Sequence, residues 1–221
     1  MDSSFKSFFL IYLIIYRIRN ITMAMKEYSG TDEKIIKATF EILQEEGFAK
    51  ATTKKIATKA GVNEVTIFRN FTNKKNLVEA TKEYYKQILI NKLEEIFEFE
   101  EDDEIEEYLK ISFFGILNLR EEDLSILRVA MEEVREDPKK KNLISNITDV
   151  VLNKLEEFFK IKMEKGIIRE VNPKSVAIMC FGMLFQSVIL WKVYNHDLDF
   201  ETNYYADDLI DLMYDGIKPQ V

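Results

Sequence analysis

Residues Thr52–Leu77, TTKKIATKAGVNEVTIFRNFTNKKNL, contain the most informative structural pattern of this chain. It predicts two short helices, at about 53–60 and about 64–71. Between them stands Gly61, which can adopt the left-handed backbone conformation that a tight reversal needs. A polar residue able to cap the helix start precedes each helix, namely Thr52 and Asn63.

The second of these helices has one face for the core and one for solvent. Ile67 and Phe71 lie four residues apart, so both must point inward. Thr66, Arg69 and Asn70 then point outward.

A longer helix is predicted just upstream, at 31–46. Thr31 can cap it, acidic residues occupy its first turn, where the helix dipole favours anions, and Gly47 supplies the stop. Two short helices around a glycine-containing turn, braced by a preceding helix, form a helix-turn-helix pattern.

This region resembles the DNA-binding domain of the tetracycline-repressor (TetR) family, and close resemblance covers about 31–78. The matching positions are Thr52, Ile56, Ala57, Ala60, Gly61, Val62, Thr66, Ile67, Phe71 and Lys74. The resemblance implies a sequence-specific DNA-binding transcriptional regulator, a repressor that a small molecule releases from its operator. It places the DNA contacts at Thr52, Lys54, Lys55, Asn63, Glu64, Thr66, Phe68, Arg69, Asn70 and Lys74.

The chain departs from the family pattern at two of these positions. Phe68 stands where the family commonly has a tyrosine, so it cannot donate the phosphate hydrogen bond that the resemblance would give that hydroxyl. Glu64 stands where a cation is frequent, and it could accept from a cytosine amino group or simply point to solvent.

The chemistry of these residues supports the same roles. The helix that starts after Thr52 presents free N–H groups beside Lys54 and Lys55, and such a terminus binds a DNA phosphate well. In the major groove, Arg69 can read guanine and Asn70 can read adenine, each contact worth about 1–3 kcal/mol of discrimination.

The charge distribution fits a DNA-binding head on an acidic protein. The formal net charge is −8, yet residues 26–75 hold ten lysines and arginines against seven acidic residues. Residues 76–221 are acidic, so the total hides a local basic patch that can attract phosphates. The alternative interpretation is that the lysines form an ordinary solvated face with no role in binding DNA.

Only 7 glycines and 3 prolines occur in 221 residues, which favours long helices joined by short connections. Further helices are predicted at about 75–98, 104–119, 121–136, 140–165, 173–195 and 203–216. We therefore expect an all-α fold: an apolar N-terminal extension at 1–25, a three-helix helix-turn-helix domain at 26–75, and a helical-bundle domain for effector binding and dimerisation at 76–221.

The apolar run at 8–16 is too short for an ordinary transmembrane helix, which needs about 20 residues. Our preferred interpretation is that residues 1–22 are an upstream extension from a misplaced start codon. The alternative is a segment that tethers the chain to a membrane or a partner.

A single cysteine and a single histidine argue against disulfides, most metal sites and a Ser-His-Asp arrangement. We expect a cytoplasmic protein with no enzymatic activity, no cofactor, no metal and no stable membrane association. The rival hypothesis is a helical-bundle enzyme or lipid-handling protein with an incidental basic head.

The resemblance implies that the C-terminal region senses an effector and dimerises. Aromatic and methionine side chains suit an adaptable pocket for an apolar small molecule, and the candidates are Tyr108, Phe113, Phe114, Phe159, Met179 and Met183. The alternative is that these residues are ordinary core.

The segment 176–193 is apolar nearly all round and therefore needs cover on all sides. A second subunit can supply it, and the candidate homodimer residues are Phe185, Ile189, Lys192, Leu209, Leu212 and Met213. A transmembrane span is the competing interpretation of this segment.

Overall fold

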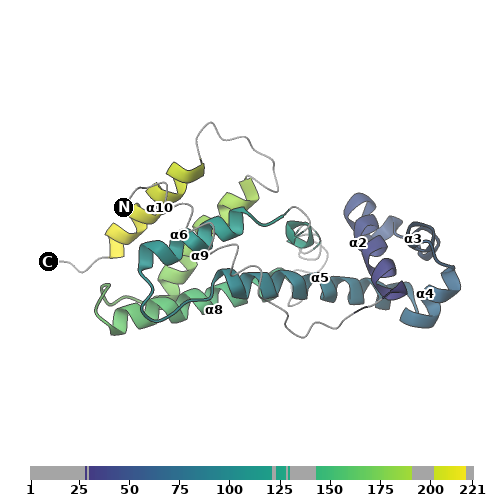
Figure 1. Cartoon of the computed structure of the whole chain (residues 1–221), viewed down its shortest axis with the longest axis horizontal. Coiled ribbons are helices and arrows are strands. Elements are labelled where there is room, and N and C mark those ends of the chain that lie inside the picture. The colour runs from purple at the N-terminus through teal and green to yellow at the C-terminus, as the bar shows by residue number, and fades with distance from the viewer. Residues whose placement is uncertain are drawn as a thin grey trace. The chain divides into compact units, whose positions relative to one another are not determined.

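The computed structural model describes residues 28, 30–120, 123–127, 129, 143–190 and 202–217. Every element described there is a helix, which confirms the all-α fold class (Figure 1). The helices are α2 (Thr31–Lys50), α3 (Thr53–Ala60), α4 (Glu64–Phe71), α5 (Lys74–Ile96), α6 (Ile105–Leu117), α8 (Leu143–Glu164), α9 (Pro173–Val188) and α10 (Thr202–Ile217). The predicted extension at 1–25 and most of the predicted helix at 121–136 lie outside the described residues.

The first helix begins differently from the prediction. Thr31 does not cap it: Gly30 is the N-cap, at φ 60°, and Thr31 is the first helical residue. Gly47 has φ 76°, so the regular helix breaks there as predicted. A further turn nevertheless follows, and the N–H of Ala51 donates to the carbonyl of Gly47 at 3.3 Å.

The other helix ends follow their local sequence closely. Asn172 caps α9 by accepting from the N–H of Ser175, with Pro173 at the first helical position, where its missing N–H costs little. Gly166, at φ 69°, lies two residues beyond the end of α8. No described helix has both the length and the apolar character needed to cross a membrane.

The chain forms two compact units, and the boundary between them lies inside α5, at residues 89 and 90. The first unit, here called the head, includes α2, α3, α4 and the first part of α5, which Figure 1 shows grouped together. Its core is built from residues of all four helices: Ile35, Ile36, Ala38, Ile42, Leu43, Ala51, Ile56, Ala57, Ile67, Phe71, Leu77 and Val78. Phe40 of α2 and Tyr85 of α5 stack with ring centroids 3.5 Å apart.

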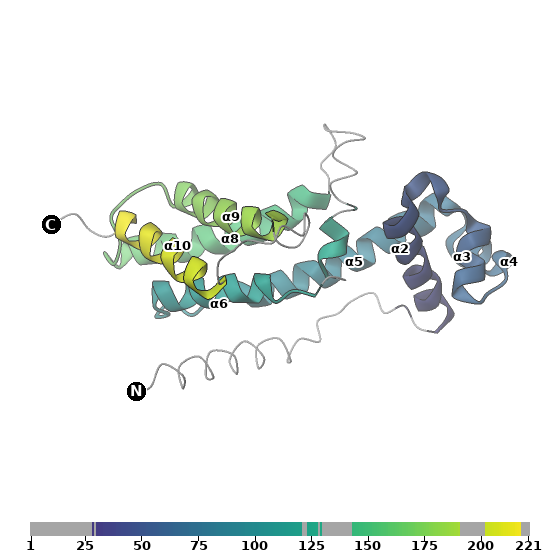
Figure 2. The same cartoon turned by 90° about the horizontal axis from the view of Figure 1, so that it is seen from above.

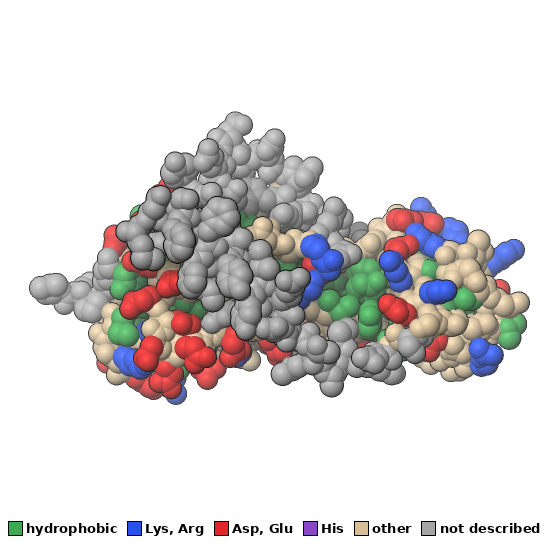
Figure 3. Space-filling view, viewed as in Figure 1, with side chains coloured by type: hydrophobic (Ala, Val, Ile, Leu, Met, Phe, Trp, Pro, Cys, Tyr) green, Lys and Arg blue, Asp and Glu red, His purple; other side chains and the backbone are tan. Residues whose placement is uncertain are grey.

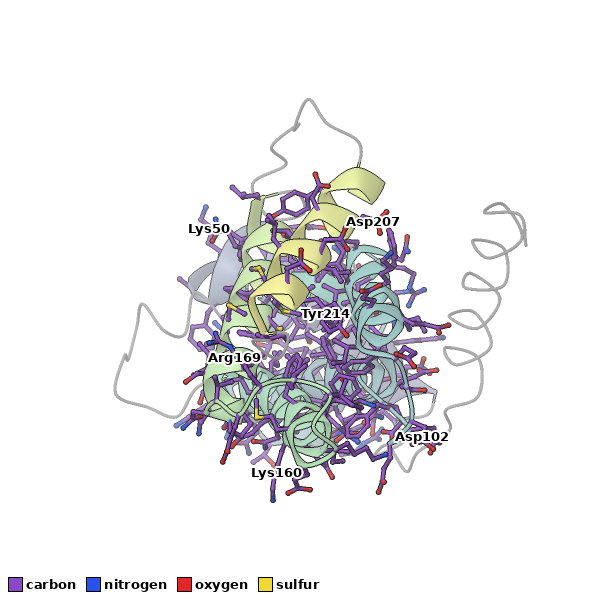
Figure 4. All side chains as sticks on the ribbon, turned by 90° about the vertical axis from the view of Figure 1, so that its left-hand side faces the viewer. Lys50, Asp102, Lys160, Arg169, Asp207 and Tyr214 are labelled. Atoms are coloured by element: carbon purple, nitrogen blue, oxygen red, sulfur yellow. The ribbon has the colours of Figure 1, made fainter. Side chains whose placement is uncertain are left out.

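The second unit, here called the bundle, contains the end of α5 together with α6, most of α8, α9 and α10 (Figure 2). Gly115 allows α6 to approach α5 closely, because an added Cβ would lie 2.9 Å from a methyl carbon of Ile96. α10 lies beside α6, and Asp207, labelled in Figure 4, pairs with Lys110 at 2.9 Å. The bundle core includes an aromatic cluster in which the rings of Tyr108 and Phe158 are 4.0 Å apart.

Candidate nucleic-acid interface

The turn between α3 and α4 has the geometry that the sequence predicts. The Thr52 side chain accepts from the N–H of Lys55 at 3.2 Å, and the Asn63 side chain accepts from the N–H of Val65 at 2.9 Å. Gly61 adopts the left-handed conformation, φ 67° and ψ 35°. Both predicted caps and the predicted turn glycine are therefore confirmed, and α4 starts in a fixed direction.

α4 buries Ile67 and Phe71 in the head core and turns its other face to solvent. Among the predicted DNA contacts, Asn63, Phe68, Arg69 and Asn70 are exposed, whereas Glu64 and Thr66 are half-buried. Val65 is not among the predicted contacts, yet its side chain is 70 % exposed and lies on the same helix. Its position three residues before Phe68 was the available clue.

Glu64 is held within the protein. Its carboxylate accepts a hydrogen bond of 2.5 Å from the hydroxyl of Thr53, at the start of α3. This bond links the first turns of the two helices. The carboxylate is therefore neither simply solvated nor fully available to a cytosine amino group.

Arg69 is oriented by Asn70, which is itself held by Asp32. The Nε–H of Arg69 donates to the side-chain oxygen of Asn70 at 3.2 Å, and the amide nitrogen of Asn70 donates to a carboxylate oxygen of Asp32 at 2.5 Å. The Nε bond leaves the two terminal nitrogens of the guanidinium for an outside acceptor. Asp32 is one of the acidic residues in the first turn of α2, and its bond to Asn70 was not predicted because no local pattern links residues 38 positions apart.

Two lysines of α3 form ion pairs with carboxylates of α2. Lys55 pairs with Glu46 at 2.5 Å, and Lys59 pairs with Glu45 at 2.9 Å and Glu41 at 3.2 Å. The hydrogen bond from Lys55 lowers the pKa of Glu46, and the hydrogen bond to Glu45 raises the pKa of Lys59. These pairs are exposed, so they bind the lysines weakly and a phosphate can compete for them.

Lys50, Lys54 and Lys75 lie close in sequence to α3 and α4 or within them, and the described residues give none of them a carboxylate partner. Lys74 is half-buried: its ammonium donates to the carbonyl of Phe48 at 2.8 Å and lies 4.3 Å from the centroid of the Phe48 ring. The ammonium has three N–H groups, so this contact fixes its position without exhausting its donors.

On the face in Figure 3, lysine and arginine side chains stand out on the head, and acidic side chains gather on the bundle.

The predicted pocket residues lie mainly in the bundle core. Tyr108, Phe113 and Phe159 are buried, and the Tyr108 hydroxyl donates to the carbonyl of Phe97 at 3.1 Å. Burial raises the pKa of Tyr108 above its ordinary range. Phe114 and Met183 are half-buried, whereas Met179 is 43 % exposed. Their role in effector binding stays a prediction.

The predicted dimer residues also differ in burial. Leu212 is 73 % exposed, and Phe185 and Leu209 are half-buried, so all three can meet a partner surface. Ile189 and Met213 are buried, and the Sγ of Cys180 contacts the Sδ of Met213 at 2.8 Å. Lys192 lies outside the described residues.

Within the described part of the chain, no group of three or more His, Cys, Asp or Glu side chains could hold a metal ion.

Comparisons with known proteins agree with this geometry. Residues 35–81 match the family model described as bacterial regulatory proteins, tetR family. The chain is similar to the HTH-type transcriptional regulator YvkB of Bacillus subtilis, with 30 % identity over 158 residues that cover 70 % of this chain and 79 % of that protein.

Two further similarities cover most of the chain. A fatty acid metabolism regulator protein of Bacillus subtilis is 26 % identical over 196 residues, which cover 87 % of this chain and 98 % of that protein. The solved structure of the transcriptional regulator FadR from Bacillus subtilis, in complex with stearoyl-CoA, matches with a TM-score of 0.59 and 26 % identity. That match covers 84 % of this chain and 98 % of the solved one.

Proposed function

The chain belongs to the tetR family of bacterial regulatory proteins, whose members are ligand-responsive DNA-binding transcriptional repressors, and we propose that it represses transcription by inserting α4 into the major groove of an operator. The observation that carries this proposal is the exposed face of α4, on which Asn70 orients Arg69. Arg69 reads guanine with its terminal nitrogens, and Asn70 acts chiefly by positioning Arg69.

The phosphate contacts come from the amino end of α3 and the cations around it. Like any helix, α3 begins with backbone N–H groups that have no partner within the helix, and these bind an anion. Thr52, Lys54 and Lys55 lie at this end, and Lys74 is held in place by Phe48. Since DNA carries a dense row of phosphates, these contacts set the affinity and α4 sets the sequence.

We propose that the regulator acts as a homodimer in the cytoplasm, with two α4 helices reading half-sites about one helical turn, ~34–36 Å, apart. The exposed Leu212 of α10 and the half-buried Phe185 of α9 support an interface built from these two helices. The named relatives are regulators, so we propose no enzymatic activity.

The effector is an amphipathic molecule with a long apolar chain. Two matches support this: one protein is named a fatty acid metabolism regulator, and one solved structure contains stearoyl-CoA. Binding in the bundle favours a dimer whose two heads have the wrong spacing for the operator, and DNA is then released through the difference in affinity.

Gel-shift binding of the full chain tests this function, with its own upstream DNA and with DNA selected from a random library. We expect a discrete complex whose affinity falls steeply with salt. Lys54→Ala should weaken binding to every DNA and reduce the salt slope of the dimer by about 2, because each subunit loses one phosphate contact. The matched control is Lys160→Ala, an exposed lysine of α8 in the bundle (Figure 4), which should change neither quantity.

Stearoyl-CoA added to the preformed complex should release the DNA, and free coenzyme A should not. Release by neither compound, together with no thermal stabilisation of the protein by stearoyl-CoA, would rule out the proposed effector class. Absence of any specific complex, both upstream and after selection, would reject DNA-binding regulation itself.

A further inference from the structure

Two large apolar side chains stand on the solvent face of α4. Val65 is 70 % exposed and Phe68 is 47 % exposed. Being three residues apart on one helix, they occupy the same face. The inward positions of this short helix are filled by Ile67 and Phe71, so the core cannot accept the exposed pair.

Resting on the proposed function, we propose that Val65 and Phe68 contact the 5-methyl groups of thymines in the operator, so that this chain reads thymine by apolar contact beside the guanine read by Arg69. Val65 is the second residue of α4, and the N-terminal residues of a recognition helix are those that reach the base edges. The thymine methyl is the apolar group that a base edge presents in the major groove.

The side-chain chemistry admits this contact and excludes a polar one. Neither Val65 nor Phe68 carries a hydrogen-bond donor or acceptor in its side chain, so neither can read a polar base edge. The aromatic ring at position 68 also lacks a hydroxyl for a phosphate. An apolar contact is what remains for both residues.

The surroundings favour DNA as the occupant of this face. Glu64 precedes Val65, and its carboxylate would repel phosphates if it pointed outward. The Thr53 hydroxyl instead holds that carboxylate toward the start of α3, at 2.5 Å. The exposed charge on α4 is then the cation of Arg69, with Lys54 on the neighbouring helix. Asn63 caps the helix at the N–H of Val65, which fixes the direction in which the valine projects.

The size of the effect follows from the size of a methyl group. Burying one carbon of this kind corresponds to about a fourfold gain in affinity. A symmetric dimer makes each contact twice, so losing the same methyl from both half-sites should cost about 15-fold.

The experiment replaces each thymine of the selected operator by deoxyuridine, which removes the 5-methyl group and leaves the base-pairing edge and the O4 acceptor unchanged. We expect one or two positions per half-site at which the full chain loses about fourfold in affinity. Val65→Ala should abolish the penalty at one such position, and Phe68→Ala should abolish it at another or reduce it at the same one. Both side chains are exposed, so circular dichroism should show unchanged folding.

The matched control is Ile167→Ala, which removes a side chain that is 39 % exposed in the bundle and should keep every uracil penalty. An operator that binds equally well after every thymine replacement overturns the inference while the DNA-binding function stands. The same holds if both variants of α4 keep the full penalties. If selection and upstream DNA yield no operator, the proposed function and this inference fall together.

Discussion

Replacing Arg69 by lysine separates charge from base reading at the centre of the proposed interface. The Nε–H of Arg69 donates to Asn70, which is itself held by Asp32, so the guanidinium is already oriented in the free protein. Lysine keeps the positive charge but loses the planar fork that matches the O6 and N7 acceptors of guanine. Arg69→Lys should therefore weaken recognition and leave non-specific attraction intact.

The expected magnitude is that of one bidentate base contact per subunit, about 1–3 kcal/mol or about 5- to 150-fold in affinity for each half-site that the dimer occupies. Binding to a scrambled duplex should change by less than about twofold, because its affinity comes from phosphate charge. The assay is fluorescence anisotropy with labelled operator and unlabelled scrambled competitor at fixed salt. Arg169→Lys, the same exchange at an exposed arginine of the bundle (Figure 4), is the matched control and should leave both affinities unchanged.

A variant that binds the operator as tightly as the parent chain, with the same preference at every base pair, would refute the role of Arg69. Equal losses on operator and scrambled DNA would also refute it, since they would make Arg69 a phosphate contact. Asn70→Ala provides a second check: if Asn70 only positions Arg69, its substitution should cost less than Arg69→Lys and should add little to it.

Three further predictions concern stability and reactivity. Gly61→Ala should lower the free energy of unfolding by about 1–2 kcal/mol, because Gly61 has φ 67°. Gly182→Ala, on the exposed side of α9, should raise the free energy of unfolding by about 0.5–1 kcal/mol. Urea unfolding measures both, and equal effects of the two substitutions would contradict the argument from backbone conformation. Burial lowers the pKa of Lys162, so between the lowered pKa and the ordinary ~10.4 the folded state binds fewer protons than the unfolded state. The free energy of unfolding of the parent chain should therefore rise with pH through that window, relative to that of Lys162→Met. A difference between the two proteins that stays constant with pH would contradict this prediction. Burial raises the pKa of Cys180 to about 12. A thiol reagent at neutral pH should therefore modify Cys180 readily only when urea has unfolded the chain. Rapid labelling of the folded chain would contradict the burial of this thiol.

The local features of the head could be predicted because the interactions that create them span only a few residues. The Thr52 and Asn63 caps bond to backbone groups three and two residues away. The inward positions of Ile67 and Phe71 follow from the period of the helix. The cap of α2 was assigned one residue too late, because Thr31 is a good capping residue and sequence alone did not show that Gly30 takes the positive φ there.

The tertiary structure decided which polar groups meet, because those partners are far apart in the sequence. Asp32 reaches Asn70, Phe48 holds Lys74, and Lys162 is buried with its ammonium 2.7 Å from the carbonyl of Glu101, 61 residues away. No helical period encodes such pairs. They form only when packing of the apolar faces brings the helices together. The local sequence was therefore enough to predict the helices, their buried faces and the family, whereas the partners and the exposure of the polar side chains follow from the packing of the whole chain.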